Sequence, residues 1–160
     1  MNQRGWLDKR TFETIVSAAP LISIDLIVRD LFGSVLLGKR VNPPAKGYWF
    51  VPGGRILKNE TVSEAFSRIT RVELGCGLSI TEARYIGLFE HFYSDSVFGS
   101  DVTTHYLVQG FEISVTDDLA LPSQQHCDYR WLPEARLLTD DQVHNHSKWY
   151  FQQEKGFKTL

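Results

Sequence analysis

Pro52-Gly53-Gly54-Arg55 begins the segment that decides the fold, and it is followed at fixed spacing by Glu60, Arg68, Glu73 and Gly75. Five residues separate Gly54 from Glu60, and seven separate Glu60 from Arg68. Proline lacks a backbone donor, and paired glycines reach φ values that are closed to other residues. We therefore expect regular strand pairing to end at Pro52 and a loop to begin there.

A helix is predicted directly after this loop, over Val62 to Leu74. Thr61 and Glu64 have the spacing of a capping box, and Gly75 is a suitable C-terminal stop. Hydrophobic periodicity predicts strands over 22–28, 34–39, 85–93, 103–115 and 129–132, and helices over 7–19, 133–138 and 142–154. This order indicates an α/β (α+β) chain with one mixed sheet, a single domain over residues 1–160, and an N-terminal helical arm over residues 1–20.

Composition excludes several classes of partner. The formal net charge of −2 gives no basic footprint for nucleic acid, so we expect no nucleic-acid partner. Cys76 and Cys127 lie far apart without metal-ligand spacing, which favours reduced thiols in a cytoplasmic protein. Residues 1–9 contain no apolar run of signal-peptide length, and no apolar stretch approaches the ~20 residues that cross a bilayer, so no membrane association is expected.

The glycine-rich turn and the helix after it have the chemistry of a phosphate site. Such a turn frees backbone groups near a phosphate, and carboxylates on the helix hold a hard cation such as Mg²⁺ through oxygen. Residues 54–76 resemble the Nudix box, G-x5-E-x7-R-E-U-x-E-E-x-G-U, where U is bulky and aliphatic. The resemblance implies a Nudix fold, a mixed β-sheet sandwiched between α-helices. Two of the three metal-binding carboxylates of the usual box are replaced, by Ile69 and Val72, and Glu73 remains.

A lone carboxylate disfavours attack on phosphorus assisted by several metal ions. A single metal ion can still make the diphosphate a better leaving group, helped by the planar guanidinium groups of Arg40, Arg55 and Arg68. That arrangement suits cleavage on the carbon side of the phosphoester, where the sugar acquires oxocarbenium-like character.

Beyond the box, the chain resembles the GDP-mannose mannosyl hydrolases, a divergent Nudix branch. The resemblance rests on segments at 36–40, 47–55, 91–93, 103–106 and 125–131, together with the departures at Ile69 and Val72. It implies hydrolysis of GDP-mannose, and of other GDP-hexoses, to GDP and free sugar, by attack of water on the anomeric carbon with inversion. It further implies one Mg²⁺ per active site, with Mn²⁺ as a substitute, and a homodimer.

Roles for individual residues follow from this resemblance. The metal ligands would be the Gly53 carbonyl and the side chains of Glu73 and Gln125. His126 would be the general base, a task that suits histidine because imidazole accepts a proton near neutral pH. The remaining members of the site would be Arg40 and Arg55 at the diphosphate, Tyr106 and Asp25 within the site, His91 at the sugar, and Arg68.

Several of these side chains have competing structural interpretations. His91 lies among aromatic residues in a strand, where a buried core histidine is the ordinary reading, and Asp25 needs a partner in a strand interior. Arg68 and Glu60 in this family mainly brace the loop and the helix. His105 and Tyr106 face opposite sides of their strand, and we expect Tyr106 to join the site. His144 and His146 flank the final helix, where capping or exposure is the default.

Two other functions remain open at this point. A conventional Nudix pyrophosphohydrolase would attack phosphorus and release a nucleoside monophosphate, which the substitutions at Ile69 and Val72 disfavour. A nucleotide-sugar binding module would retain the pocket without turnover, which the presence of His126 disfavours.

Overall fold

The computed structural model describes residues 6–116, 119–122, 126–152 and 155–156. In chain order its elements are α1 (Lys9–Ala18), β1 (Leu21–Arg29), β2 (Val35–Arg40), β3 (Trp49–Phe50), β4 (Gly53–Arg55), α2 (Val62–Leu74), the 3-10 turn η1 (Ile80–Glu82), β5 (Arg84–Tyr93), β6 (Thr104–Ser114), β7 (His126–Leu132), α3 (Glu134–Thr139), α4 (Asn145–Lys148) and η2 (Trp149–Phe151).

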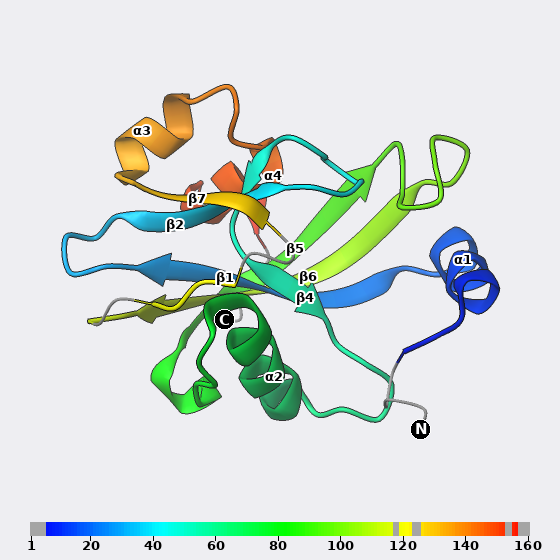
Figure 1. The fold of residues 1–160 in the computed structure, drawn as a ribbon, viewed down its shortest axis with the longest axis horizontal. Helices are drawn as coiled ribbons and strands as arrows, with labels where there is room; N and C mark the ends of the chain where they lie inside the picture. The colour runs from blue at the N-terminus through cyan, green and yellow to red at the C-terminus, as the bar shows by residue number, and fades with distance from the viewer. Residues whose placement is uncertain (1–5, 117–118, 123–125, 153–154, 157–160) are drawn as a thin grey trace.

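The strands form one mixed sheet with helices on both faces, as the sequence predicts. Its main path runs β3-β2-β1-β6-β5, with β4 added beside β1 and β7 beside β2. The β1 and β6 pair is parallel, and the other pairs are antiparallel. Figure 1 shows α2 below the sheet, α3 and α4 above it, and α1 at one end. No helix in the described part of the chain is both long and apolar enough to span a membrane.

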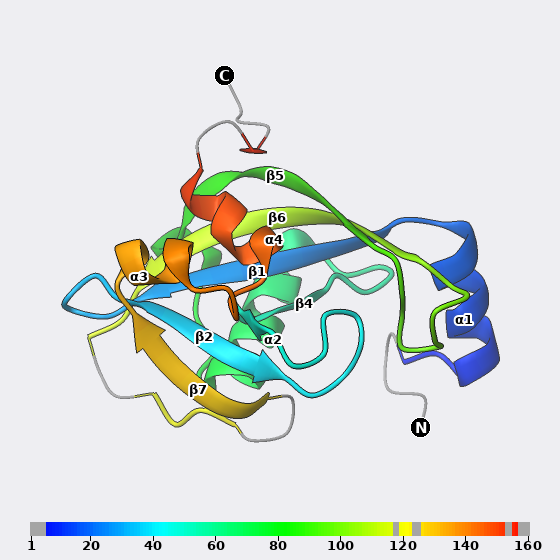
Figure 2. The same cartoon turned by 90° about the horizontal axis from the view of Figure 1, so that it is seen from above.

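The sheet divides next to β1. Strands β1 and β2 share the pair Arg29 and Val35, and β4 then takes the edge of β1 opposite Ser23 to Asp25. Strands β2 and β7 run away from β1 beyond that point, as Figure 2 shows from above. A cavity lined by residues of β1, β2 and β4 lies at this divergence.

The prediction that a loop begins at Pro52 is wrong, because Gly53 to Arg55 form strand β4. Pro52 joins the pairing through its carbonyl, which accepts a hydrogen bond from the Leu26 N–H at 2.8 Å. A Cβ at Gly53 would collide with Asp25 Oδ1 and with the Ile24 carbonyl. The glycine therefore allows close strand pairing, rather than ending it.

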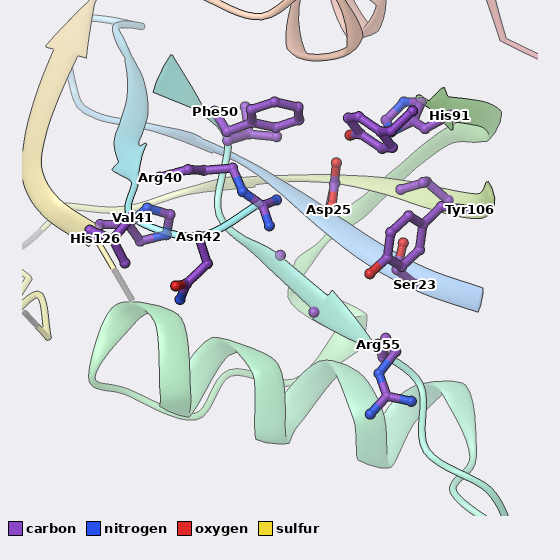
Figure 3. A pocket seen from close by; sticks show the side chains of 15 residues that line it. Ser23, Asp25, Arg40, Val41, Asn42, Phe50, Arg55, His91, Tyr106 and His126 are labelled. Atoms are coloured by element: carbon purple, nitrogen blue, oxygen red, sulfur yellow. The ribbon is translucent and has the colours of Figure 1, made fainter. Parts of the chain in front are cut away.

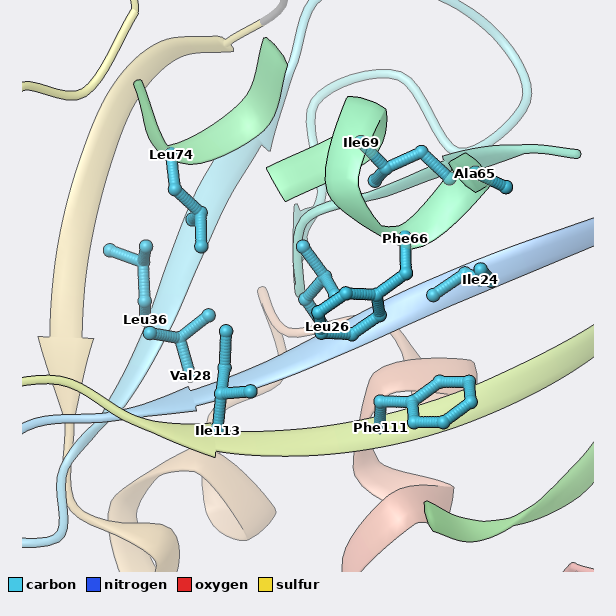
Figure 4. Packing of buried hydrophobic residues seen from close by; sticks show 10 residues of the cluster. All are labelled: Ile24, Leu26, Val28, Leu36, Ala65, Phe66, Ile69, Leu74, Phe111 and Ile113. Carbon is cyan, nitrogen blue, oxygen red and sulfur yellow. The ribbon is translucent and has the colours of Figure 1, made fainter. Parts of the chain in front are cut away.

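Helix α2 has the predicted bounds, and both of its predicted ends are confirmed. Thr61 and Glu64 form a reciprocal capping box, and Gly75 ends the helix at φ 77°, in the left-handed region that glycine adopts without strain. One face of α2 packs on the sheet in an apolar cluster that Figure 4 shows, which contains Ile24, Leu26, Val28, Leu36, Ala65, Phe66, Ile69, Leu74, Phe111 and Ile113.

Other elements are confirmed, with one correction at the C-terminal end. Helix α1 starts after Asp8, whose side chain accepts from the Thr11 N–H, and the two long strands β5 and β6 are present. The predicted helix over 142–154 is wrong: the chain forms α4, four residues long, and then the short turn η2. Both elements contact the sheet: Tyr150 of η2 bonds Asp25 of β1, and His146 of α4 stacks on His91 of β5.

Candidate active site

A cavity of about 230 Å³ opens where β2 leaves β1. Figure 3 shows side chains from β1, β2, β4, β5, β6 and β7 converging on it. Seven predicted site residues line it, namely Asp25, Arg40, Gly53, Arg55, His91, Tyr106 and His126. Glu73 contacts one of these residues, and Arg68 does not line the cavity. Gln125 lies outside the described residues.

Glu73 and His126 meet at the base of this site. His126 Nε2 lies 3.3 Å from Glu73 Oε2, and both side chains are buried. Helix α2 positions Glu73 on its last turn, while β7 brings His126 beside β2. Gly38 makes room for the imidazole, because a Cβ there would stand 2.5 Å from ring atoms of His126. The Nδ1 atom of His126 is buried and has no hydrogen-bond partner in the described part of the structure.

Ile69 and Val72, which replace two carboxylates of the usual Nudix box, differ in solvent exposure. Ile69 is 1% exposed and packs in the core, with its side chain against Gly54. Val72 is 45% exposed, on the outer side of α2. Glu73 is 2% exposed. Of the three box positions, only Glu73 therefore presents a carboxylate, and it does so on the side of α2 that faces His126.

The backbone carbonyl of Gly53, which lines the cavity, is also available as an oxygen ligand. Hydrogen bonds join Leu26 to Pro52 and Ile56 to Ile22 across the β1 and β4 pair. Bonded and non-bonded pairs alternate in an antiparallel ladder, so Gly53 is in a non-bonded pair and its carbonyl points away from β1.

These groups fit one hard cation, because carboxylate and carbonyl oxygens are the ligands that Mg²⁺ prefers. Within the residues that the structure describes, no three or more His, Cys, Asp and Glu side chains gather into a metal-binding set. Glu73 and the Gly53 carbonyl are two oxygen donors of the kind that such a cation takes.

Asp25 enters the cavity from β1, where its carboxyl accepts a hydrogen bond from the Tyr150 hydroxyl at Oδ2. Burial raises the pKa of Asp25 to about 7, and Tyr150 and Arg40 act in the opposite direction. The partner that the sequence required for this carboxylate is thus a tyrosine from the C-terminal segment, with an arginine nearby.

His91 is buried at 2% exposure and belongs to a group of aromatic rings. Its ring stacks on His146 with 4.2 Å between centroids and 10° between planes. Burial, together with His146 and His144, lowers the pKa of His91 to about 2. His91 is consequently neutral near pH 7, and it can form hydrogen bonds without adding charge.

Two arginines give the cavity its positive charge. Figure 3 shows the Arg40 guanidinium reaching toward the middle of the cavity, and its central carbon lies 5.5 Å from the centre of the Phe50 ring. Arg55 lies on β4 with its guanidinium 4.3 Å from the centre of the Phe12 ring, and burial lowers its pKa. Tyr106 lines the same cavity. The pair of arginines forms a binding surface for an anion such as a diphosphate.

The prediction that His105 and Tyr106 face opposite sides of β6 is confirmed. Tyr106 lines the cavity, whereas His105 stacks on Phe92 at 4.3 Å between ring centroids, on the other face of the strand pair. His144 caps α4 by accepting from the His146 N–H, as the default interpretation predicts. His146 is not exposed: it is buried at 6% exposure against His91.

Arg68 braces the loop before α2. Its guanidinium binds both carboxylate oxygens of Glu60, at 2.6 and 2.9 Å, and donates to the Arg55 carbonyl at 2.7 Å. Glu60 in turn accepts from the Leu57 N–H at 2.9 Å. The sequence left Arg68 two roles, at the diphosphate and as a brace, and its contacts are those of the brace, which reaches the cavity lining through the Arg55 carbonyl.

Glu60→Gln is expected to lower the free energy of unfolding by about 1 kcal/mol at pH 7, a modest loss because Arg68 is 34% exposed and solvent screens the pair. Arg68 holds the pKa of Glu60 below its usual 4.5, so the stabilisation is present above pH 4.5 and is lost as pH falls further. Denaturant unfolding at pH 7 and pH 3 checks this, with the exposed Asp141→Asn as control. An equal loss at both pH values would contradict it.

Sequence reasoning missed several cavity residues. Ser23, Asn42, Phe50 and Tyr93 line the cavity, and Tyr150 binds Asp25 from behind it. The tyrosine lies 125 residues beyond its partner, within a segment predicted as one regular helix. No local pattern signals that contact. Phe50 and Tyr93 lie within the matched segments 47–55 and 91–93, and Asn42 lies two residues after Arg40, so position in or beside a motif was the signal available.

Comparisons with known proteins agree on the architecture. A sequence model described as NUDIX domain matches residues 19–153. The low-salt glycan biosynthesis protein Agl8 of Haloferax volcanii is 44% identical over 132 residues, covering 78% of this chain and 83% of that protein.

Solved structures extend the agreement to the fold. The MutT protein from Methanosarcina mazei Go1 has a TM-score of 0.69 at 20% identity, covering 84% of this chain and 92% of that chain. The NUDIX domain of Shewanella oneidensis NrtR, solved in complex with ADP ribose, has a TM-score of 0.62 at 17% identity, covering 91% and 96%. The predicted mixed sheet with flanking helices is the architecture that these proteins share.

Proposed function

Because this chain belongs to the Nudix family, we propose that it hydrolyses GDP-mannose, or a related GDP-hexose, to GDP and the free sugar. Nudix hydrolases act on nucleoside diphosphate derivatives, and the finer assignment is carried by one observation. Glu73 is the carboxylate that α2 retains, and it lies 3.3 Å from His126, beside a cavity with two arginines. One carboxylate next to one imidazole suits activation of water for attack on carbon.

The proposed reaction breaks the bond between the anomeric carbon and the diphosphate oxygen. Water attacks the anomeric carbon from the face opposite the diphosphate, and His126 accepts the proton that the water loses. A new carbon–oxygen bond forms to water, and the electron pair of the broken bond stays on the departing diphosphate. Arg40 and Arg55 stabilise the charge that this oxygen acquires, and the configuration at the anomeric carbon inverts.

One Mg²⁺, or Mn²⁺ in its place, would be held by Glu73, by the Gly53 carbonyl and by Gln125, and when bound it would neutralise diphosphate charge. The family resemblance implies these three ligands, and two observations support them: the Gly53 carbonyl points away from β1, and Glu73 lies beside His126 of the cavity lining. Asp25, His91 and Tyr106 then remain for the uncharged part of the substrate. The name of the Haloferax relative refers to glycan biosynthesis, which supports a sugar-bearing substrate.

Two further predictions about the whole protein remain with this proposal. They are a cytoplasmic location and a homodimeric assembly, and the second is implied by the family resemblance. A sedimentation measurement addresses the second prediction directly.

The product of hydrolysis in ¹⁸O-labelled water tests the position of attack. We expect GDP and mannose, with the label in mannose, because the new bond is to carbon. A conventional pyrophosphohydrolase would instead release GMP and mannose 1-phosphate with the label in phosphate. Binding of GDP-mannose without turnover, in the presence of Mg²⁺, would favour a nucleotide-sugar binding module. Either of those outcomes would reject the proposal.

A further inference from the structure

We infer that Tyr150 is a positioning residue for the sugar end of the cavity: its hydroxyl fixes the Asp25 carboxyl so that the second carboxyl oxygen receives a hydroxyl group of the hexose. The inference rests on the proposed function, since it requires a hexose in this cavity. It assigns a role to the C-terminal segment, α4 and η2, which contributes no residue to the matched motifs.

The Asp25 carboxyl is constrained at both oxygens. Oδ2 accepts a hydrogen bond from the Tyr150 hydroxyl, and Oδ1 occupies the space that a Cβ at Gly53 would fill. Asp25 and Gly53 face each other as a strand pair, so this contact is set by the sheet. With Oδ2 bonded to the tyrosine, Oδ1 lies against Gly53, and both Asp25 and Gly53 line the cavity.

The Tyr150 ring is held in place by packing. It meets Phe89 edge to face, with 4.7 Å between ring centroids, and its hydroxyl lies 3.5 Å from His91 Nε2. His91 in turn stacks on His146. The same C-terminal segment therefore contacts Asp25 through Tyr150 and His91 through His146.

The cavity lining combines charged groups with a neutral one. Arg40 and Arg55 match the negative diphosphate, whereas His91 stays neutral because burial and the neighbouring histidines lower its pKa to about 2. A neutral imidazole and a carboxyl with a free oxygen are hydrogen-bonding partners for sugar hydroxyls. The hexose is the part of the proposed substrate that needs such partners.

The proposed positioning role requires the hydroxyl group of Tyr150 rather than its ring. A phenylalanine would pack on Phe89 equally well, but it would leave Asp25 Oδ2 without its donor. The carboxyl would then be free to turn toward Arg40, whose charge already acts on it. Loss of this single hydrogen bond should thus affect sugar binding and spare the diphosphate.

Calorimetric binding of GDP and GDP-mannose, with Mg²⁺ and in a His126→Gln background that slows turnover, tests the inference. We expect Tyr150→Phe to weaken GDP-mannose binding about 5- to 20-fold while GDP binding changes less than about twofold, the loss expected of one hydrogen bond to a charged group. Tyr85→Phe is the matched control, because it removes a hydroxyl from a partly exposed tyrosine that does not line this cavity. In an Asp25→Asn background, Tyr150→Phe should add less than about twofold, since the tyrosine acts through Asp25.

Failure of the positioning role and failure of the proposed function give different results. Equal weakening of GDP and GDP-mannose binding, or an unchanged effect of Tyr150→Phe when Asp25 is already Asn, would overturn the positioning role alone. If the wild-type protein releases no mannose and the His126→Gln protein binds GDP-mannose no better than GDP, the proposed substrate is wrong and the inference falls with it.

Discussion

Replacing His126 with glutamine is expected to lower kcat for GDP-mannose by about 10²- to 10⁴-fold and to change KM by less than about threefold. The reason is geometric. His126 lines the cavity, and its Nε2 is 3.3 Å from Glu73 Oε2. Glutamine keeps a polar side chain of similar length but cannot accept the proton of the attacking water. Binding through Arg40 and Arg55 is left intact.

Steady-state kinetics of His126→Gln and of His105→Gln measure this effect. The second variant is a matched control, because His105 stacks on Phe92 on the face of β6 that turns away from the cavity. Thermal melts of both proteins establish that the fold is kept. A kcat within tenfold of the wild type in His126→Gln would show that another group accepts the proton, and the general-base assignment would then be wrong.

The features predicted well from sequence are those that depend on neighbouring residues. The ends of α2 follow from a capping box and from a glycine at φ 77°, and both signals lie within four residues of the helix end they define. The opposite orientation of His105 and Tyr106 follows from strand alternation alone. Local rules therefore placed the elements and the direction of many side chains.

The features that were missed depend on contacts between distant strands. Pro52 and Gly53 are signals for a loop only if nothing pairs with them, yet β1 supplies both the donor for Pro52 and the facing residue for Gly53. The same applies to Tyr150, whose partner Asp25 is 125 residues away. Hydrophobic periodicity gives no information about contacts between distant residues. The residues that line the cavity could therefore be predicted only where they belong to a recognised motif.

Arg68 shows why a motif does not by itself assign a role. Its spacing from Glu60 is a fixed part of the box, and the structure explains the spacing as an ion pair that supports the Arg55 carbonyl. The guanidinium was counted with Arg40 and Arg55 as a phosphate ligand, since all three are chemically suited to the task. Only the structure shows that Arg40 and Arg55 line the cavity, whereas Arg68 holds β4 in place.

Glu73→Gln is expected to lower kcat/KM by at least about 10²-fold, because the variant removes the charge of the carboxylate that α2 offers to a metal ion, and such charge stabilisation amounts to several kcal/mol. Glutamine fills the same volume and can still bond His126, so the fold should be kept. Ile69 in the core and Val72 in solvent cannot replace the missing charge.

Binding of Mn²⁺ followed by electron paramagnetic resonance gives a readout that is independent of turnover. Glu73→Gln should weaken Mn²⁺ binding in the presence of GDP by at least about tenfold, as expected for loss of a charged ligand. Glu90→Gln, an exposed carboxylate on β5 that does not line the cavity, should leave it unchanged. Unaltered Mn²⁺ affinity in Glu73→Gln would remove Glu73 from the ligand set. Any loss of activity in that variant would then be due to the contact with His126 alone.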